Sequence, residues 1–222
     1  MSYESFANMT KSSPMNTSPN IGSTREALQY AAPYIRGKVL DAGGGSTAKY
    51  RSLILSHASE YVCLDGRAGG FTDVVGDVMD MPFQEGAFDT VVCNQVLEHV
   101  PQPKKVIAES YRVLKPGGHL ICTVPFLEAS HADPGDYFRY TFQGLETLCR
   151  EAGFEITHIQ PYGGLFSVLY SFIKFSWFSP YRKLSLTEKR LSRWLGNIFG
   201  FLDRFSNSKI IYSDVLIIAH KK

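Results

Sequence analysis

Short apolar runs alternate with longer segments of helical periodicity along most of the chain. The apolar runs contain β-branched residues and are bounded by Gly, Pro or Asp, which is typical of buried strands. We therefore expect strands over 38–41, 61–64, 73–75, 89–94, 119–124, 154–159 and 214–219. Helices are expected between them, over 23–35, 47–59, 103–114 and 141–152. This alternation predicts an α/β fold with a doubly wound, mostly parallel sheet that is covered on both faces.

Capping and helix-breaking residues mark several of these boundaries. Pro103 suits the first position of a helix, and the sequence 115–118, Lys-Pro-Gly-Gly, stops that helix. Thr141 is the expected N-cap of the next helix, and Gly153 supplies its left-handed C-terminal residue. Periodicity and local chemistry therefore agree on where these two helices begin and end.

The segment 162–209, which separates the last two expected strands, is predicted to be a helical insertion before the last strand. Residues 162–205 hold 12 of the 29 aromatic residues of the chain. One helix is expected over 165–178, and a second follows the capping box Ser185-x-x-Glu188. The second helix has an apolar stripe at Leu191, Trp194, Leu195, Ile198, Phe199 and Leu202.

Three interpretations of this insertion remain open. Amphipathic stripes usually pack against other protein surfaces, which favours a helical lid over the pocket that would hold the substrate. Basic residues beside Trp and Phe also suit anionic headgroups, so 162–205 can form a peripheral contact with the inner face of a membrane. A dimer interface is the third interpretation, and the oligomeric state is not predicted.

Composition indicates a globular chain. The 222 residues are 44% hydrophobic and 20% charged, which fits one domain with an appendage and excludes a disordered or coiled-coil chain. No apolar run reaches the ~18–20 residues that a membrane span requires. Residues 1–22 are rich in Ser, Asn and Pro, and we expect a flexible segment there rather than a secretory signal. The four cysteines form no CxxC pair, so reduced core thiols and a cytoplasmic location are expected.

Charge is distributed unevenly along the chain. The net charge of +2 combines −5 over residues 1–173 with +7 over residues 174–222. Because the larger part is acidic and no nucleic-acid module is recognisable, we expect no nucleic-acid partner.

A glycine-rich turn follows the first expected strand and is the sharpest functional signal. Gly43 and Gly45 allow bare backbone to approach a ligand, and Asp65, twenty positions after Gly45, can accept hydrogen bonds from ribose hydroxyls. With Ala48 the glycines also fit a dinucleotide site. Asp41, just before the turn, would repel a pyrophosphate but suits a cofactor with an ammonium and a sulfonium. A nicotinamide-binding oxidoreductase is therefore the less favoured alternative.

Five segments together resemble a class I S-adenosylmethionine-dependent methyltransferase, most closely the bacterial type 11 family. In chain order they are Val39–Gly45, Asp65, Gly76–Phe83, Phe88–Val100 and Arg112–Gly118. The resemblance implies a Rossmann-like, seven-stranded sheet with a C-terminal antiparallel hairpin strand. It also implies S-adenosyl-L-methionine as cofactor and S-adenosyl-L-homocysteine as product.

The resemblance also assigns roles to residues at the strand ends. Asp41 would organise the amino-acid end of the cofactor, Asp65 would hold the ribose, and Asp77 with Val78 would clasp the adenine. The full set of expected cofactor residues is Asp41, Ala42, Gly43, Gly44, Gly45, Asp65, Asp77, Val78, Asn94 and Gln95. The alternative for Asp77 is a loop acid that caps Met79.

Catalytic candidates lie in two places, after the fourth and fifth strands. Methyl transfer is an in-line displacement that needs a general base only when the acceptor is a hydroxyl or a protonated amine. His131 is the expected base because an imidazole titrates near neutral pH. Asp136 and Arg139 would orient a ligand or form a local pair, and His99 is the weaker candidate.

A metal site at Glu98 and His99 is not expected. Some relatives with Glu-x-x-Glu-His at this position bind a divalent metal, but Gln95 stands here in place of the first Glu. Glu98 and His99 are instead expected to start the next helix and to bond locally.

The sequence therefore predicts an S-adenosylmethionine-dependent methyltransferase that acts on a small-molecule, saccharide or lipid-linked acceptor. Oxygen is favoured over nitrogen as acceptor because of His131. A catalytically silent binding or scaffold protein of the same fold is the alternative. The expected organisation is a segment 1–22, a cofactor domain formed by 23–161 with 210–222, and the helical insertion 162–209.

Overall fold

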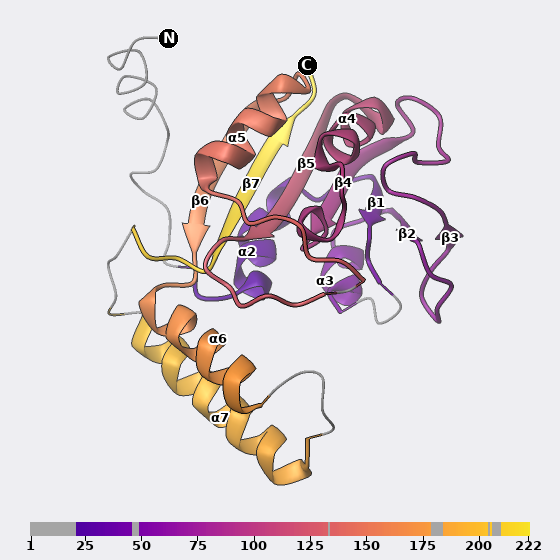
Figure 1. The fold of residues 1–222 in the computed structure, drawn as a ribbon. Coiled ribbons are helices and arrows are strands. Elements are labelled where there is room, and N and C mark those ends of the chain that lie inside the picture. The colour runs from indigo at the N-terminus through magenta and orange to yellow at the C-terminus, as the bar shows by residue number, and fades with distance from the viewer. Residues whose placement is uncertain (1–20, 46–48, 133, 179–183, 204, 206–209) are drawn as a thin grey trace, which may run out of the picture.

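A computed structural model describes residues 21–45, 49–132, 134–178, 184–203, 205 and 210–222. Its centre is a seven-stranded sheet in the order β3-β2-β1-β4-β5-β7-β6 (Figure 1). The strands are β1 (Lys38–Ala42), β2 (Glu60–Asp65), β3 (Val74–Val75), β4 (Phe88–Asn94), β5 (Leu114–Pro125), β6 (Glu155–Tyr162) and β7 (Asp214–His220). The first five pair in parallel, whereas β7 is antiparallel to both β5 and β6. The predicted α/β fold with a reversed C-terminal strand is confirmed.

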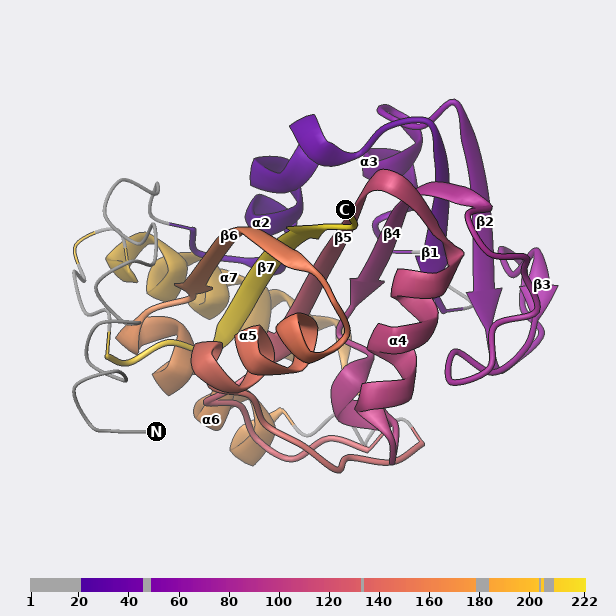
Figure 2. The ribbon, with the colours of Figure 1, turned by 90° about the horizontal axis from the view of Figure 1, so that it is seen from above.

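Helices cover both faces of this sheet (Figure 2). One face carries α2 (Thr24–Ala31) and α3 (Arg51–Leu55), and the other carries α4 (Pro103–Val113) and α5 (Phe142–Glu151). Successive strand residues point to opposite faces. Accordingly, Val39 packs in the core cluster with α2 and α3, whereas Leu40 packs in the larger cluster with α4 and α5. Both faces of the sheet are therefore buried, as the apolar runs predicted.

Capping interactions are present at several helix ends, including the predicted ones at Thr141 and Gly153. Ser23 Oγ accepts the amide of Glu26 at 3.3 Å, and Thr141 Oγ1 accepts the amide of Gly144 at 3.1 Å. Gly153 adopts the left-handed conformation with φ of 101°. These helix ends are determined by local sequence.

Three boundaries differ from the prediction. The first helix becomes a 3₁₀ turn, Ala32–Tyr34, because Pro33 cannot donate an amide hydrogen to continue it. The helix expected over 47–59 is α3, Arg51–Leu55, and positions 46–48 lie outside the described residues. Strand β5 begins at Leu114 instead of 119, because Gly117 and Gly118 exchange backbone hydrogen bonds with Lys221. This last pairing joins distant segments, and periodicity cannot reveal it.

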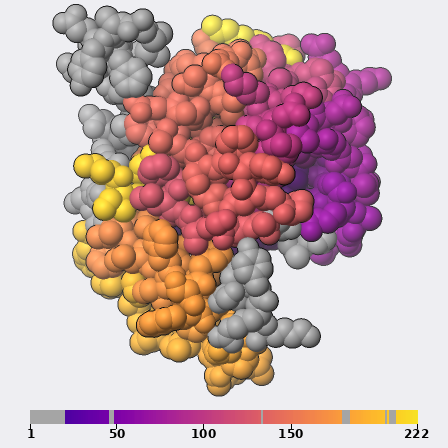
Figure 3. Space-filling model, viewed as in Figure 1, coloured from indigo at the N-terminus to yellow at the C-terminus, as the bar shows by residue number. Residues whose placement is uncertain are grey.

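The insertion contains two antiparallel helices, α6 (Leu165–Trp177) and α7 (Leu186–Asp203). They lie side by side and extend away from the sheet as a lobe at the bottom of the view (Figures 1 and 3). Phe199 of α7 contacts the rings of Phe166 and Tyr170 of α6. The Tyr170 hydroxyl donates to the carbonyl of Ser192 at 2.6 Å. Within the described part of the chain, no helix is both long and apolar enough to cross a membrane.

The two helices are also joined by a buried carboxylate. Asp203 ends α7 and accepts the amides of Phe166 and Ser167 at 2.8 Å each, together with the Ser167 hydroxyl. These amides belong to the first turn of α6, which has no helical partners for them. Asp203 therefore caps α6 from the neighbouring helix.

We expect Asp203→Ala to expose the first turn of α6, since two amides lose their acceptor. The local stability of that turn should fall by about 1–2 kcal/mol, and exchange of the Phe166 and Ser167 amides should accelerate about 5- to 30-fold. Hydrogen–deuterium exchange measures both. Thr141→Ala, which removes the cap of α5, is the control and should leave these amides unchanged. Unchanged exchange in Asp203→Ala would contradict the cap.

Candidate functional site

A cavity of about 410 Å³ opens at the edge where β1 and β4 end. Open α/β sheets bind ligands at this edge, outside the carboxyl ends of their parallel strands. Of the residues expected to bind a cofactor, the cavity is lined by Asp41, Gly43, Gly44, Asn94 and Gln95. Additional charged or titratable lining residues are Lys49, Tyr50, Glu128, His131 and Asp214.

Glycine is required at the turn after β1 for two different reasons. Gly43 and Gly45 have φ of 80° and 72°, which L side chains rarely adopt. A Cβ on Gly43 would lie 2.5 Å from a methyl of Val96, and a Cβ on Gly44 would lie 2.6 Å from an oxygen of Asp41. The turn is therefore packed against its surroundings on one side, while nothing lies within 4 Å of a Cβ at Gly45.

Asp65 connects this turn to the end of β2. One of its carboxylate oxygens accepts the amide of Gly45 and the other accepts the amide of Arg67, both at 2.9 Å. Asp65 thus holds the glycine turn in place, although it does not itself line the cavity.

Asp41 is buried below the turn, with 5% of its surface exposed. The Tyr61 hydroxyl donates to its carboxylate at 2.6 Å. Burial is the main cause that raises the pKa of Asp41 to about 6, and the charge of Asp65 raises it further, while the Tyr61 hydrogen bond opposes the shift. Ionised Asp41 is therefore costly without a neighbouring positive charge, and a cation beside it would relieve that cost.

A second carboxylate, Asp214, faces the same cavity and was not predicted. It begins β7, whose reversed direction brings its first residue beside Pro125 at the end of β5. Asp214 accepts the Ser213 hydroxyl at 2.5 Å and the side-chain amide of Gln95 at 2.9 Å. Burial, with the charge of Glu128, raises the pKa of Asp214 to about 7. The only sequence signal was an acidic residue at the start of an apolar strand.

Gln95 and Asn94 are held in place at the end of β4. Gln95 has φ of 55°, an unusual value for a residue with a side chain, and its backbone amide donates to the Thr123 carbonyl at 2.9 Å. Asn94 accepts the Thr123 hydroxyl at 2.6 Å. Residues held in such conformations cluster at functional sites.

The other expected cofactor residues lie beyond the cavity lining. Asp77 accepts the amide of Met79 at 2.8 Å, which is the capping interaction considered as its alternative role. Val78 and Ala42 are buried in the core. These residues shape the turns around the site without lining the described cavity.

The loop after β5 is held by a local ion pair. Asp136 binds Arg139 through both oxygens, at 2.5 and 2.9 Å, and also accepts the Ser130 hydroxyl and the His131 amide. The Arg139 guanidinium holds the pKa of Asp136 well below its usual range. Asp136 and Arg139 therefore position His131, whose side chain lines the cavity.

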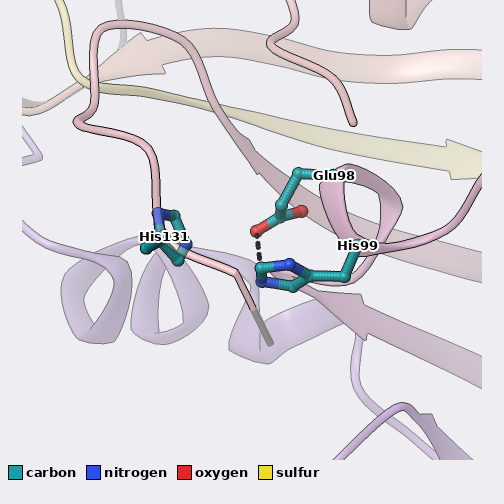
Figure 4. Close-up of side chains that lie close together, drawn as sticks. All are labelled: Glu98, His99 and His131. Carbon is teal, nitrogen blue, oxygen red and sulfur yellow. Dashed lines mark ion pairs between the residues drawn. The ribbon is translucent and has the colours of Figure 1, made fainter. Parts of the chain in front are cut away.

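Glu98 and His99 lie in a short 3₁₀ helix, Leu97–His99, next to His131 (Figure 4). Glu98 is fully buried, and burial raises its pKa to about 8. His99 Nε2 lies 3.7 Å from Glu98 Oε1, and the rings of His99 and His131 are 5.2 Å apart. The structure thus brings together two candidate imidazoles that are 32 positions apart in the sequence.

Comparisons with known proteins agree with this arrangement. Residues 40–122 match the type 11 family described as a methyltransferase domain. The chain is 37% identical over 126 residues to a ubiquinone/menaquinone biosynthesis C-methyltransferase of Methylobacterium nodulans, covering 55% of this chain and 45% of that protein. It is 41% identical over 97 residues to a sterol 24-C-methyltransferase of Neurospora crassa, covering 36% of this chain and 26% of that protein. The chain therefore spans less than half the length of these two relatives.

The fold itself is shared more widely. The structure of a [4+2]-cyclase superposes with a TM-score of 0.63 at 18% identity, covering 98% of this chain and 92% of that one. A likeness at this identity concerns the fold alone, because one fold supports many activities.

We expect Asp41→Asn to stabilise the ligand-free protein more at pH 8 than at pH 4. Because the folded-state pKa is raised, ionisation of Asp41 costs stability as the pH rises from about 4 through 6. The amide removes a cost of up to about 3 kcal/mol at pH 8 and little at pH 4. Urea unfolding at the two pH values measures the difference. Glu85→Gln, at an exposed carboxylate, is the control, and equal gains at both pH values would contradict the burial of charge.

Proposed function

We propose that this chain, whose residues 40–122 match the type 11 methyltransferase domain, transfers a methyl group from S-adenosylmethionine to a small-molecule, saccharide or lipid-linked acceptor. The observation that carries the proposal is the cavity beside the glycine turn, where Asp41 and Asp214 present carboxylates. Family and site chemistry independently favour the same cofactor.

The charged groups of the cavity fit this cofactor better than a dinucleotide. Asp41, Glu128 and Asp214 are acidic, and Lys49 is the basic lining residue among those described. S-Adenosylmethionine has an ammonium and a sulfonium for the carboxylates and one carboxylate for the lysine. A pyrophosphate would instead face three acids, which disfavours the nicotinamide alternative.

The residues around the glycine turn would hold the cofactor in different ways. Gly43 and Gly45 would present backbone to the methionine portion, and Asp41 and Asp214 would meet its cationic groups. Asp65 already accepts two amides, but a carboxylate has about four lone-pair sites, which leaves room for ribose hydroxyls. Asp77 and Val78 would contact the adenine. When bound, S-adenosylmethionine supplies an electrophilic methyl carbon on a positively charged sulfur.

The acceptor would approach from the loop that carries His131. We infer that the His131 imidazole takes the proton from an acceptor hydroxyl, which favours oxygen over nitrogen. By their names, the relatives reported above are C-methyltransferases, one of sterols and one of ubiquinone/menaquinone biosynthesis. A lipid-like acceptor is thus the first class to screen, with saccharides and small polar molecules next.

The α6–α7 pair carries an apolar and basic surface suited to a membrane. Leu169, Phe172, Leu191, Trp194 and Phe201 are each between 44% and 60% exposed. Basic side chains accompany them on the two helices, at Lys174, Lys189, Arg190 and Arg193. Exposed aromatic and basic side chains together bind anionic membrane surfaces. We propose that this element, 162–209, places the domain at the inner membrane face where a lipid-linked acceptor would lie.

Calorimetric titration with S-adenosylmethionine, S-adenosylhomocysteine and NAD tests the cofactor. We expect binding of the first two and none of NAD. Asp65→Ala should weaken the binding of both adenosyl ligands by about 1–3 kcal/mol, or about 5- to 150-fold in affinity. Glu85→Ala is the control and should bind both with unchanged affinity. Binding without turnover in an acceptor screen would favour the silent scaffold protein, and no adenosyl binding would reject the proposed function.

Vesicle flotation tests the membrane contact. We expect the full chain to float with vesicles containing phosphatidylglycerol more than with neutral vesicles, and less as salt rises, because charge attraction is screened. The double variant Leu191→Ser/Trp194→Ser should bind the anionic vesicles several-fold less than the wild type. Phe71→Ser, at an exposed residue between β2 and β3, is the control and should bind them as the wild type does. Equal flotation of all three would reject the contact, and a dimer that the double variant dissociates would favour the interface interpretation.

A further inference from the structure

Three side chains from two separate loops converge beside the cavity (Figure 4). Glu98 and His99 come from the 3₁₀ helix after β4, and His131 comes from the loop between β5 and α5. One ligand atom of each residue lies within 4.8 Å of the other two. The cluster therefore presents two nitrogens and one carboxylate oxygen to a common point.

Both imidazoles are oriented so that one nitrogen remains available. His99 Nδ1 is 2.6 Å from the Gly135 carbonyl, and His131 Nδ1 is 3.0 Å from the Ala129 carbonyl. A carbonyl oxygen can only accept, so each Nδ1 carries a proton, and in the neutral imidazole each Nε2 then keeps its lone pair. Metal-binding histidines are typically oriented in this way, by a hydrogen bond from the other ring nitrogen.

Glu98 lacks hydrogen-bond partners among the described residues, and His99 Nε2, 3.7 Å from Glu98 Oε1, forms an ion pair with it only when the imidazole is protonated. The Glu98 side chain is fully buried. Nearby Glu128 and Asp214 repel its charge, and the nearby cation, Arg139, is bound to Asp136. A buried carboxyl group is ordinarily hydrogen-bonded, paired with a cation or coordinated to a metal.

We propose that Glu98, His99 and His131 bind a divalent first-row transition-metal ion such as Zn²⁺. Two imidazoles and one carboxylate suit Zn²⁺, Co²⁺ or Fe²⁺, whereas Mg²⁺ prefers oxygen ligands. Two ligands at about 2.1 Å from one tetrahedral ion are about 3.4 Å apart, so ligand atoms that lie up to 4.8 Å apart need to approach each other by at most about 1.4 Å.

The expectation of no metal rested on Gln95, and the structure shows why that argument is incomplete. Gln95 donates its side-chain amide to Asp214 and is engaged there. The third ligand is instead His131, which the chain delivers from another loop. An Nε2 that binds an ion cannot also accept a proton from the acceptor, so the two roles of His131 exclude each other: with an ion bound, His131 is a metal ligand and not the general base.

The site is tested by titrating chelator-treated full-length protein with Zn²⁺ and Co²⁺, without S-adenosylmethionine. We expect one ion per chain, a visible absorption of bound Co²⁺ that Zn²⁺ abolishes, and no competition from excess Mg²⁺. Because metal binding is read directly, its failure is separate from failure of the cofactor titration. Equal competition by Mg²⁺ or the absence of stoichiometric binding would overturn the proposal.

Variants assign the ion to this cluster. Glu98→Gln and His131→Asn should each lower the affinity for Zn²⁺ at least about tenfold. Circular dichroism checks that both variants fold. His220→Asn is the matched control, because His220 also faces a carboxylate, Glu155, at 3.1 Å. Unchanged affinity in either cluster variant, or a loss in His220→Asn, would place the ion elsewhere and overturn the proposal. If one cluster variant fails to fold, the other and His99→Asn carry the same test.

Discussion

The glycine turn after β1 is the constraint on which the rest of the site depends. Val96 and the Asp41 carboxylate occupy the space that side chains at positions 43 and 44 would need. The backbone therefore follows one tight path, which Asp65 fixes through the Gly45 amide. This path leaves the end of β1 open to the cavity, which Gly43 and Gly44 line together with Asp41.

Acidic groups are concentrated at this edge at a cost to the empty protein. Burial raises the pKa of both Asp41 and Asp214, so their ionised forms are poorly stabilised without a cation. Such a site is less stable by itself than an apolar one, and the difference is recovered when a cationic ligand binds. The same reasoning applies to Glu98, whose oxygens are buried without hydrogen-bond partners among the described residues.

The loop after β5 links the cofactor side of the site to the helical lobe. Asp136 and Arg139 fix the loop backbone, and His131 faces the cavity from it. The His131 ring also lies 6.0 Å from the ring of Phe175 in α6. The helical lobe therefore contacts, through Phe175, the residue that faces the cavity.

The sequence by itself determined the strands and helices, the Gly43–Gly45 turn, the capping residues and the acidic residue before the turn, because these depend on local periodicity and backbone conformation. Tertiary structure decided the rest. The reversal of β7 placed Asp214 beside Gln95, and the packing of two loops placed His131 beside Glu98 and His99. These contacts join residues far apart in the chain, and their formation depends on strand order and loop packing, which local periodicity does not encode.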